Sequence, residues 1–314
     1  MSQESMKMDS YALGLDLGGT SVKAAALDGE VLIAQDHEPF DLAEPMAFAR
    51  AMERVVERFT VRMGRPGSIG VSAPGIPSLD DRSIAHMPGR FEGLEGLVWG
   101  DRLERSDGVP VVNDANAALL GEVGFGAGRG ARHAVLLTLG TGVGGAVLSD
   151  GRLLRGHTGK AGHLGHVSLD PDGAPDICNA PGSLEDAMGN HNIVARTSGR
   201  FATTHDLVRA VESGDAGARE IWMRSIRALA ASIASFGNVL DPEVVIVGGG
   251  VARAGETLFG PLRTLLADME WRPGGRGLRL VPAELGELAG AHGAALWGLR
   301  GLGSQGSPTG TVVI

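Results

Sequence analysis

The chain has 314 residues, 43% of them hydrophobic, which is enough for two globular domains that each have a core. Its apolar runs are only strand-sized and its first residues lack the basic and apolar segments of a secretory signal, so we expect neither a membrane protein nor an exported one. The net charge of −9 gives no reason to expect nucleic-acid binding, and the single cysteine excludes an internal disulfide framework and fits the reducing cytoplasm.

The first half of the chain predicts a meander followed by alternating helices and strands. Short strands are expected over residues 12–17, 21–27 and 31–37, with glycine turns between them, and a helix with one apolar face over 44–62. "SIGVSAPG" predicts a strand that ends in a Pro-Gly turn, and "VPVVNDANAALLGEVGFG" predicts a buried strand that runs into a helix. "HAVLLTLGTGVGGAVLSDGRLL" then repeats the opening order of strand, glycine loop, strand, turn and strand, which indicates two related α/β halves.

The second half of the chain predicts mainly helices. A long helix is expected near 216–240, where apolar residues recur at spacings of 3 and 4 and form a stripe that suits core packing. "EVVIVGGGVA" predicts a strand into a glycine loop, followed by a helix near 255–269, and "GELAGAHGAALWGLR" predicts a last helix. We expect residues 301–314, which are small and polar until their end, to form a flexible tail.

Three glycine loops each follow an apolar run: "DLGGTS" at 16–21, "LGTGVGG" at 139–145 and "VGGGVA" at 247–252. Backbone N–H groups in such turns can bind phosphate oxygens, because glycine lets the chain approach a ligand closely. Taken singly, each loop is better explained as an ordinary hairpin turn. None of them matches the Walker phosphate loop or the dinucleotide-binding fingerprint.

In this order, the three loops resemble the phosphate-1, phosphate-2 and adenosine segments of the sugar kinase–actin ATPase superfamily. The resemblance implies an α/β protein with a two-domain actin-like ATPase (ribonuclease H-like) fold and an interdomain cleft for sugar and nucleotide. It implies a small domain at 10–115 plus 286–300 and a large domain at 116–285. It also implies ATP as phosphoryl donor, Mg2+ oriented by Asp16 through water, and nucleotide contacts at Gly18, Gly19, Thr20, Gly140, Thr141, Gly142, Gly248, Gly249 and Gly250.

Asn113 and Asp114 lie where a predicted strand meets a predicted helix. Aspartate is a favoured helix N-cap, and this ordinary role is open to Asp114. Phosphoryl transfer to a hydroxyl group also needs a carboxylate that takes the hydroxyl proton. We interpret Asp114 as that catalytic base.

"NDANAALLGE", "GTGVGGAV", an AG-x-x-GH segment and "GSLED" resemble, in series, the ROK family of bacterial sugar kinases and sugar-responsive repressors. The resemblance runs from about residue 12 to 299. It implies a cytoplasmic kinase that phosphorylates a hexose at the 6-hydroxyl, as a glucokinase or an N-acetylhexosamine kinase, and a homodimer as a family expectation. It implies sugar contacts at Gly75, His86, Asn113, Asp114, His163, His166 and Glu185.

This sequence departs from the family pattern in its zinc motif. The family has one histidine and three cysteines, and the four positions fall here on His166, Asp176, Cys178 and Ser183. Because two of the three thiolates are missing, we expect no structural zinc, although His166, Asp176 and Cys178 could hold a metal weakly. We expect a vestigial loop in which Cys178 is a small buried hydrophobe.

Two further departures concern the sugar. His163 stands where family glucokinases have glutamate and where family N-acetylmannosamine kinases can have histidine. A neutral imidazole can accept or donate a hydrogen bond, so it could suit an acetamido carbonyl. His86 stands where the family often has asparagine, and the identity of the sugar therefore stays open.

Two other functions compete with the kinase. A repressor of the same family needs a DNA-binding domain before the first strand, and only eleven residues precede Ala12, so we do not expect one. A non-catalytic or weakly catalytic sugar-binding paralogue, acting as a sensor, is compatible with the lost zinc ligands and the changed sugar contacts.

Overall fold

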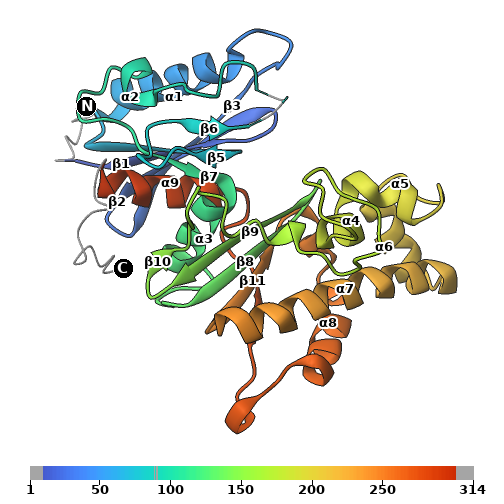
Figure 1. Ribbon diagram of the computed structural model, residues 1–314. Coiled ribbons are helices and arrows are strands. Elements are labelled where there is room, and N and C mark those ends of the chain that lie inside the picture. Colours follow the sequence, from blue (N-terminus) through green and yellow to red (C-terminus); the bar gives the residue numbers. More distant parts are fainter. Residues whose placement is uncertain (1–9, 88, 90, 302–314) are drawn as a thin grey trace, which may run out of the picture. The chain divides into compact units, whose positions relative to one another are not determined.

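The computed structural model describes residues 10–87, 89 and 91–301, and the contacts within it divide the chain into two compact units. Unit 1 comprises Met1–Gly130, Arg155–Lys160 and Glu284–Ile314, and unit 2 comprises Ala131–Leu154 and Ala161–Ala283 (Figure 1). The chain first leaves unit 1 after Gly130 and not at the expected boundary of 115, because helix α3 (Asp114–Phe125) packs against helix α9 (Ala289–Arg300) within unit 1. The expected flexible tail lies, apart from its first residue, outside the described residues.

The sheet of unit 1 has five strands in the order β3-β2-β1-β4-β7. The predicted meander is confirmed, since β1 and β3 both pair antiparallel with β2, whereas β4 runs parallel to both β1 and β7. Parallel strands end at the same edge of a sheet, so the carboxyl ends of β1, β4 and β7 carry their following loops to one edge. The bounds are β1 Ala12–Leu17, β2 Ser21–Asp28, β3 Val31–Pro39, β4 Ser68–Ala73 and β7 Val111–Asn113.

Helices cover both faces of this sheet. Helix α1 (Ala47–Met63) has an apolar face and lies above the sheet in Figure 1, while α9 lies below it. Helix α9 packs directly on the backbone of two strands at glycine residues. A Cβ at Gly14 in β1 would lie 1.8 Å from the carbonyl oxygen of Ala291, and a Cβ at Gly70 in β4 would lie 1.9 Å from that of Ala294. Unit 1 also holds the hairpin of β5 (Ile76–Pro77) and β6 (Ile84–His86) and the short helix α2 (Trp99–Arg102).

The sheet of unit 2 has the same organisation, with the order β10-β9-β8-β11-β12. Strands β8 and β10 pair antiparallel with β9, and β11 runs parallel to β8 and β12. The repetition of the opening pattern in the sequence therefore reflects two sheets of one topology, as predicted. The bounds are β8 Ala134–Leu139, β9 Val143–Ser149, β10 Arg152–Leu153, β11 Val244–Gly248 and β12 Arg279–Pro282.

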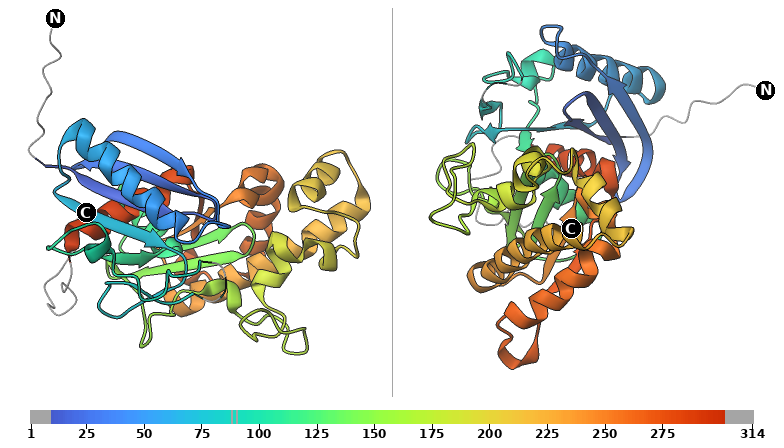
Figure 2. Two further views of the ribbon diagram at one scale, coloured as in Figure 1. Left: turned by 90° about the horizontal axis from the view of Figure 1, so that it is seen from above. Right: turned by 90° about the vertical axis from the view of Figure 1, so that its right-hand side faces the viewer.

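The core of unit 2 forms around α7 (Ala216–Leu240), whose predicted apolar stripe includes the buried residues Trp222, Ile226, Leu229 and Ile233. Helix α8 (Glu256–Met269) lies beside α7 in both views of Figure 2. Unit 2 also contains α4 (Leu184–Met188), α5 (Ile193–Arg196) and α6 (Thr204–Glu212), which were not predicted. Among the described residues, no helix has both the length and the apolar character that crossing a membrane requires.

Candidate functional site

Asp16 lies near the end of β1 in unit 1, between β2 and β4. The Ser72 hydroxyl donates a hydrogen bond to its Oδ1 at 2.5 Å, and a Cβ at Gly290 in α9 would lie 2.6 Å from its carboxyl carbon. Burial raises the pKa of Asp16 to about 6, although the hydrogen bond from Ser72 lowers it. The nearby charge of Asp114 raises this pKa further, and that of Lys23 lowers it. Such a carboxylate gains stability as an anion when a cation binds, which suits a place beside Mg2+.

The predicted phosphate-1 residues form the turn between β1 and β2. The backbone N–H of Gly18 donates to the carbonyl oxygen of Ser21 at 2.9 Å, and the carbonyl oxygen of Thr20 accepts from the N–H of Phe40 at 3.0 Å. Gly19 lies between them, and the side chain of Thr20 is exposed. The turn therefore presents backbone and one hydroxyl group, with no bulky side chain, beside Asp16.

Asn113 is the N-cap of α3, so the ordinary role that the sequence left open for Asp114 belongs to its neighbour. The Oδ1 of Asn113 accepts from the N–H groups of Ala115 and Asn116, at 3.0 and 3.3 Å. Asp114 is the first residue of the helix and is exposed. Its Oδ1 accepts from the N–H of Ala115 at 2.8 Å, which orients a carboxylate that solvent or a substrate can reach.

Asn113 also contacts the Pro-Gly turn, because its Nδ2 donates to the carbonyl oxygen of Gly75 at 3.0 Å. This bond uses one of the two hydrogens of the amide. Gly75 has φ +102°, and a Cβ there would lie 2.7 Å from the carbonyl oxygen of His86. Three of the predicted sugar-binding residues, Gly75, His86 and Asn113, thus lie together in unit 1.

The phosphate-2 loop in unit 2, Gly140 to Gly142, connects β8 to β9. The N–H of Gly140 donates to the carbonyl oxygen of Gly142 at 2.9 Å. A Cβ at Gly142 would lie 2.2 Å from Oε2 of Glu185, and that oxygen accepts from the N–H of Val143 at 2.8 Å. Glycine at this position lets the predicted sugar-binding carboxylate reach the predicted phosphate loop.

His191, which the sequence analysis did not single out, also contacts the phosphate-2 loop. Its N–H donates to the carbonyl oxygen of Thr141 at 2.8 Å, its Nδ1 lies 2.9 Å from the same oxygen, and its Nε2 lies 2.9 Å from Oδ1 of Asp186. A carbonyl and a carboxylate can only accept, so this arrangement favours the protonated ring, in which both nitrogens donate. Burial lowers the pKa of His191, but the bonds to Asp186 and Thr141 outweigh it and raise the pKa.

A cavity of about 760 Å³ adjoins the loop, within the range of volumes that hold a small ligand. Of the predicted adenosine residues, Gly250 lines the cavity at the start of the 3-10 helix Gly250–Ala254. Gly248 is buried at the end of β11, and Gly249 (φ +87°) packs so closely on Leu139 that a Cβ would lie 2.4 Å from its carbonyl oxygen. The remaining lining is Gly140, Thr141, Asn190, Thr203, Thr204, His205, Val208, Arg209, Glu212, Val251, Arg253 and Ala254.

Most of this lining was missed by sequence reasoning. Residues 203–212 belong to α6 and its N-cap, and no ligand-binding motif stands in this part of the sequence. The available signal was the pair Thr203 and Thr204 at the start of that helix, and a threonine there is equally explained as an N-cap. The side chain of Thr203 does accept a hydrogen bond from the N–H of Asp206 at 3.0 Å.

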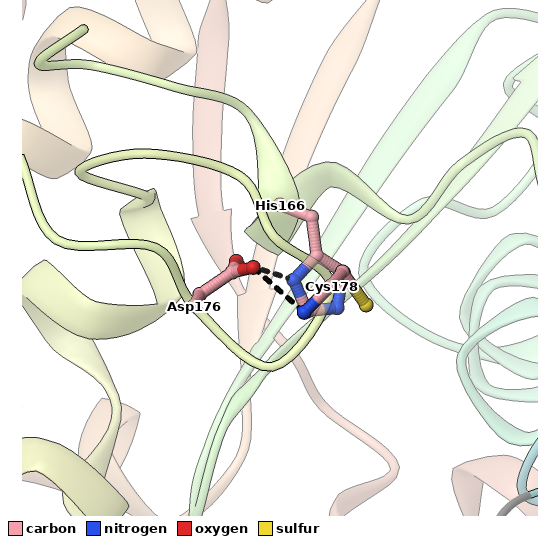
Figure 3. Close-up of side chains that lie close together, drawn as sticks. All are labelled: His166, Asp176 and Cys178. Atoms are coloured by element: carbon pink, nitrogen blue, oxygen red, sulfur yellow. Dashed lines mark hydrogen bonds and ion pairs between the residues drawn. The ribbon is translucent and has the colours of Figure 1, made fainter.

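Three of the four zinc-motif positions, His166, Asp176 and Cys178, lie together in unit 2 (Figure 3). One ligand atom from each of His166, Asp176 and Cys178 lies within 4.8 Å of the others. The expectation that Cys178 is buried is wrong: the residue is exposed, because its turn at the tip of the loop faces solvent. His163 precedes the 3-10 helix Leu164–His166 and is half-buried, close along the chain to this cluster.

These side chains do not fit a structural zinc ion. The carboxylate of Asp176 is already engaged by hydrogen-bond donors, including Nδ1 of His166 at 2.8 Å and the N–H of Cys178 at 2.8 Å. The cluster supplies a single cysteine, whereas structural zinc sites are held by four ligands that are mostly thiolates and imidazoles. Ser183, at the fourth position, is the N-cap of α4 and accepts from the N–H of Asp186.

Comparison with known proteins gives a consistent picture. The sequence pattern of the ROK family matches residues 12–300. The chain is 35% identical to a glucokinase of Thermotoga maritima over 90% of this chain and 95% of that one, and 32% identical to an N-acetylmannosamine kinase of Citrobacter koseri over 90% and 97%. The structure of a ROK family glucokinase from Streptomyces griseus in complex with glucose and AMPPNP is similar with a TM-score of 0.75 and 27% identity, over 93% of this chain and all of that one.

Proposed function

The chain belongs to the ROK family, and from this premise we propose that it is an ATP-dependent kinase that phosphorylates a hexose at the 6-hydroxyl group. One observation supports the proposal above the others. Asp114 lies exposed at the junction of β7 and α3, where its charge raises the pKa of Asp16, while Asn113 caps the helix in its place. A carboxylate that the fold does not need for capping is suited to take a proton from a substrate.

In this proposal Asp114 accepts the proton of the attacking hydroxyl group as the bond to the γ-phosphorus forms, and ADP leaves with the electrons of the broken bond. Asn113 orients the sugar with the amide hydrogen that Gly75 does not use. Mg2+, when bound, neutralises the negative charge of the transferring phosphoryl group. Asp16 would hold that ion through water, and the turn Gly18–Thr20 would contact the phosphates.

Unit 2 supplies the other predicted nucleotide contacts. The amides of Gly140 to Gly142 are suited to phosphate oxygens, and the ring of His191, whose pKa is raised, contacts the carbonyl oxygen of Thr141. The adjoining cavity of about 760 Å³ is suited to the adenosine part of ATP. Glu185, which contacts the same loop, would bind a sugar hydroxyl group close to the reacting phosphate.

The identity of the hexose depends on His163 and His86. A glucokinase of the family has a carboxylate at the position of His163, and this chain has an imidazole, as an N-acetylmannosamine kinase can have. The chain is similar in identity to proteins of both names. We therefore propose two candidate substrates, glucose and N-acetylmannosamine. We further propose that the imidazole of His163, which can donate or accept a hydrogen bond, favours the acetamido sugar.

The proposal is tested by ADP release with Mg-ATP over glucose, mannose, fructose, allose, N-acetylglucosamine and N-acetylmannosamine. Asp114→Asn is the inactivating variant, and Asp268→Asn, which alters an exposed aspartate on α8, is its matched control. Sugar-dependent turnover that is lost only in Asp114→Asn supports the kinase, and the preferred sugar identifies the role of His163. Sugar binding by calorimetry with no turnover on any sugar would support the sensor paralogue instead.

A further inference from the structure

We propose that Asp176 takes the structural place of a metal in this chain: its carboxylate alone, through hydrogen bonds, closes the loop 167–183 and positions His166. That His166 then contacts the sugar rests on the proposed function, whereas the metal-free closure of the loop does not.

The Asp176 carboxylate is saturated with donors. Its Oδ1 accepts from the N–H groups of Cys178 and Ala180, at 2.8 and 2.9 Å. Its Oδ2 lies 2.8 Å from Nδ1 of His166, and the Ser183 hydroxyl is a further hydrogen-bond partner. An ionised carboxylate offers about four acceptor sites, so these partners leave none for a cation. The side chain is only 1% exposed, and its charge is offset by these donors.

The same four partners span the loop from end to end. His166 stands before the loop, Cys178 and Ala180 lie near its tip, and Ser183 starts helix α4 after it. Backbone bonds close the base of the loop, from the N–H of Leu184 to the carbonyl oxygen of Val167 at 3.1 Å. A single buried carboxylate thus connects the segments that a metal would connect by coordination. Figure 3 shows this carboxylate with two of its partner residues, His166 and Cys178.

The contact with Asp176 also fixes the chemistry of the His166 ring. Because a carboxylate can only accept, the proton must be on Nδ1, and in the neutral ring Nε2 is then an acceptor. The ring is one-fifth exposed, so a ligand can reach it. Asp176 is in this sense a positioning residue: it touches no substrate and determines which nitrogen His166 offers to a sugar hydroxyl group.

The metal-free part is tested by zinc content and by chelators. We expect wild-type protein, purified in buffer that contains zinc, to bind zinc substoichiometrically and to keep its melting temperature when a chelator is added. The double variant Asp176→Cys with Ser183→Cys supplies three thiolates beside His166, and we expect it to bind one zinc ion per chain and to lose thermal stability on chelation. Stoichiometric zinc in the wild type, with a melting temperature that falls on chelation, would overturn the proposal.

The positioning part is tested by Asp176→Asn, with Asp172→Asn in the same loop as the matched control. Nitrogen-15 NMR of the histidine rings should show His166 with its proton on Nδ1 in wild type and control, and a changed tautomer in Asp176→Asn. Loss of a partner that orients a metal-bound histidine costs about 10- to 100-fold. We expect a loss of the same order here, as a rise in KM for the sugar with the KM for ATP unchanged. An unchanged tautomer in Asp176→Asn would refute the positioning role, whether or not the protein is a kinase.

Discussion

Replacing Asp16 by asparagine should make the protein more stable and less active. The carboxylate is held in a site where burial raises its pKa to about 6, from an ordinary value of 3.8. Asparagine has nearly the same shape and keeps an oxygen that can accept the hydrogen bond from Ser72. The substitution therefore removes an unfavourable charge without removing its hydrogen-bond partner.

The magnitude follows from the difference in pKa. The shift from 3.8 to about 6 is about 2 pKa units, and each unit corresponds to about 1.4 kcal/mol, which gives about 3 kcal/mol at full ionisation. Asp16 keeps partial access to solvent, so we expect a gain of about 1–3 kcal/mol for Asp16→Asn above pH 7. The folded wild type binds the proton of Asp16 more tightly than the unfolded chain does. Protonation therefore stabilises the wild type in full below pH 3.8, and this stabilisation is lost as the pH rises through 6.

Urea unfolding of both proteins at pH 5 and pH 8, without Mg2+ or nucleotide, measures this effect. The advantage of Asp16→Asn should be larger at pH 8 by about 1 kcal/mol, because roughly one pKa unit of the shift is titrated in that interval. Addition of Mg-ATP should stabilise the wild type more than the variant if Asp16 holds the ion as proposed. A variant that is less stable than the wild type at pH 8, or an advantage that does not change with pH, would refute the reasoning.

Three further predictions concern packing, the cavity that we propose for the nucleotide, and the loop 167–183. Gly14→Ala should lower the free energy of unfolding by about 3 kcal/mol or more, since the new Cβ would lie 1.8 Å from a carbonyl oxygen of α9. Gly260→Ala in α8 is the control: its Cβ meets only an ordinary contact at 3.5 Å, and it should raise the free energy of unfolding by up to about 1 kcal/mol. Chemical unfolding measures both changes. Ala254→Trp, in the cavity wall, should cost nucleotide binding about 1–3 kcal/mol, or roughly 10- to 100-fold in KM for ATP, while calorimetry finds sugar binding unchanged. Asp176→Asn should lower the free energy of unfolding by about 2 kcal/mol at pH 7, because hydrogen bonds from His166 and three further donors outweigh burial and lower the pKa of Asp176 to about 2. The wild type loses this stabilisation only when the pH falls from 3.8 towards 2. The difference between variant and wild type should therefore be constant between about pH 5 and 8.

The sequence predicted the elements that carry periodic patterns. The opening meander, the helix expected at 216–240 and the second copy of the meander all lie where the apolar spacing and the glycine turns indicated. These signals are local, because a strand or a helix shows its buried face within one short segment. The domain boundary was less accessible, since α3 belongs to unit 1 through its contact with α9, far away in sequence.

Glycine shows the same division between local and non-local signals. The sequence analysis assigned ligand contacts to the glycines of three loops, and in one of these loops Gly142 leaves room for the carboxylate of Glu185. Gly14 and Gly70 serve another purpose, which is the close approach of α9 to strand backbones. That contact joins segments more than two hundred residues apart, so no local pattern could reveal it.

The candidate site was predicted best where a motif describes backbone. The glycine turns, the Asn-Asp pair and the Pro-Gly turn lie where the motifs implied, and the structure adds which member of the pair caps the helix. The wall of the cavity around α6 was not foreseen, because side chains that bind by shape follow no fixed spacing. The exposure of Cys178 and the saturation of Asp176 depend on how one loop folds back on itself, and the missing cysteines alone did not indicate either.

The central claim is that Asp114 removes a proton from a sugar hydroxyl group during phosphoryl transfer from ATP. Carbon-13 and phosphorus-31 NMR of the products formed from labelled glucose and labelled N-acetylmannosamine tests it directly. We predict a phosphate ester on C6 of one of these sugars with wild type and with Asp268→Asn, and none with Asp114→Asn even though it still binds the sugar. Equal product formation by Asp114→Asn, or a phosphate ester at another carbon, would contradict the proposed reaction.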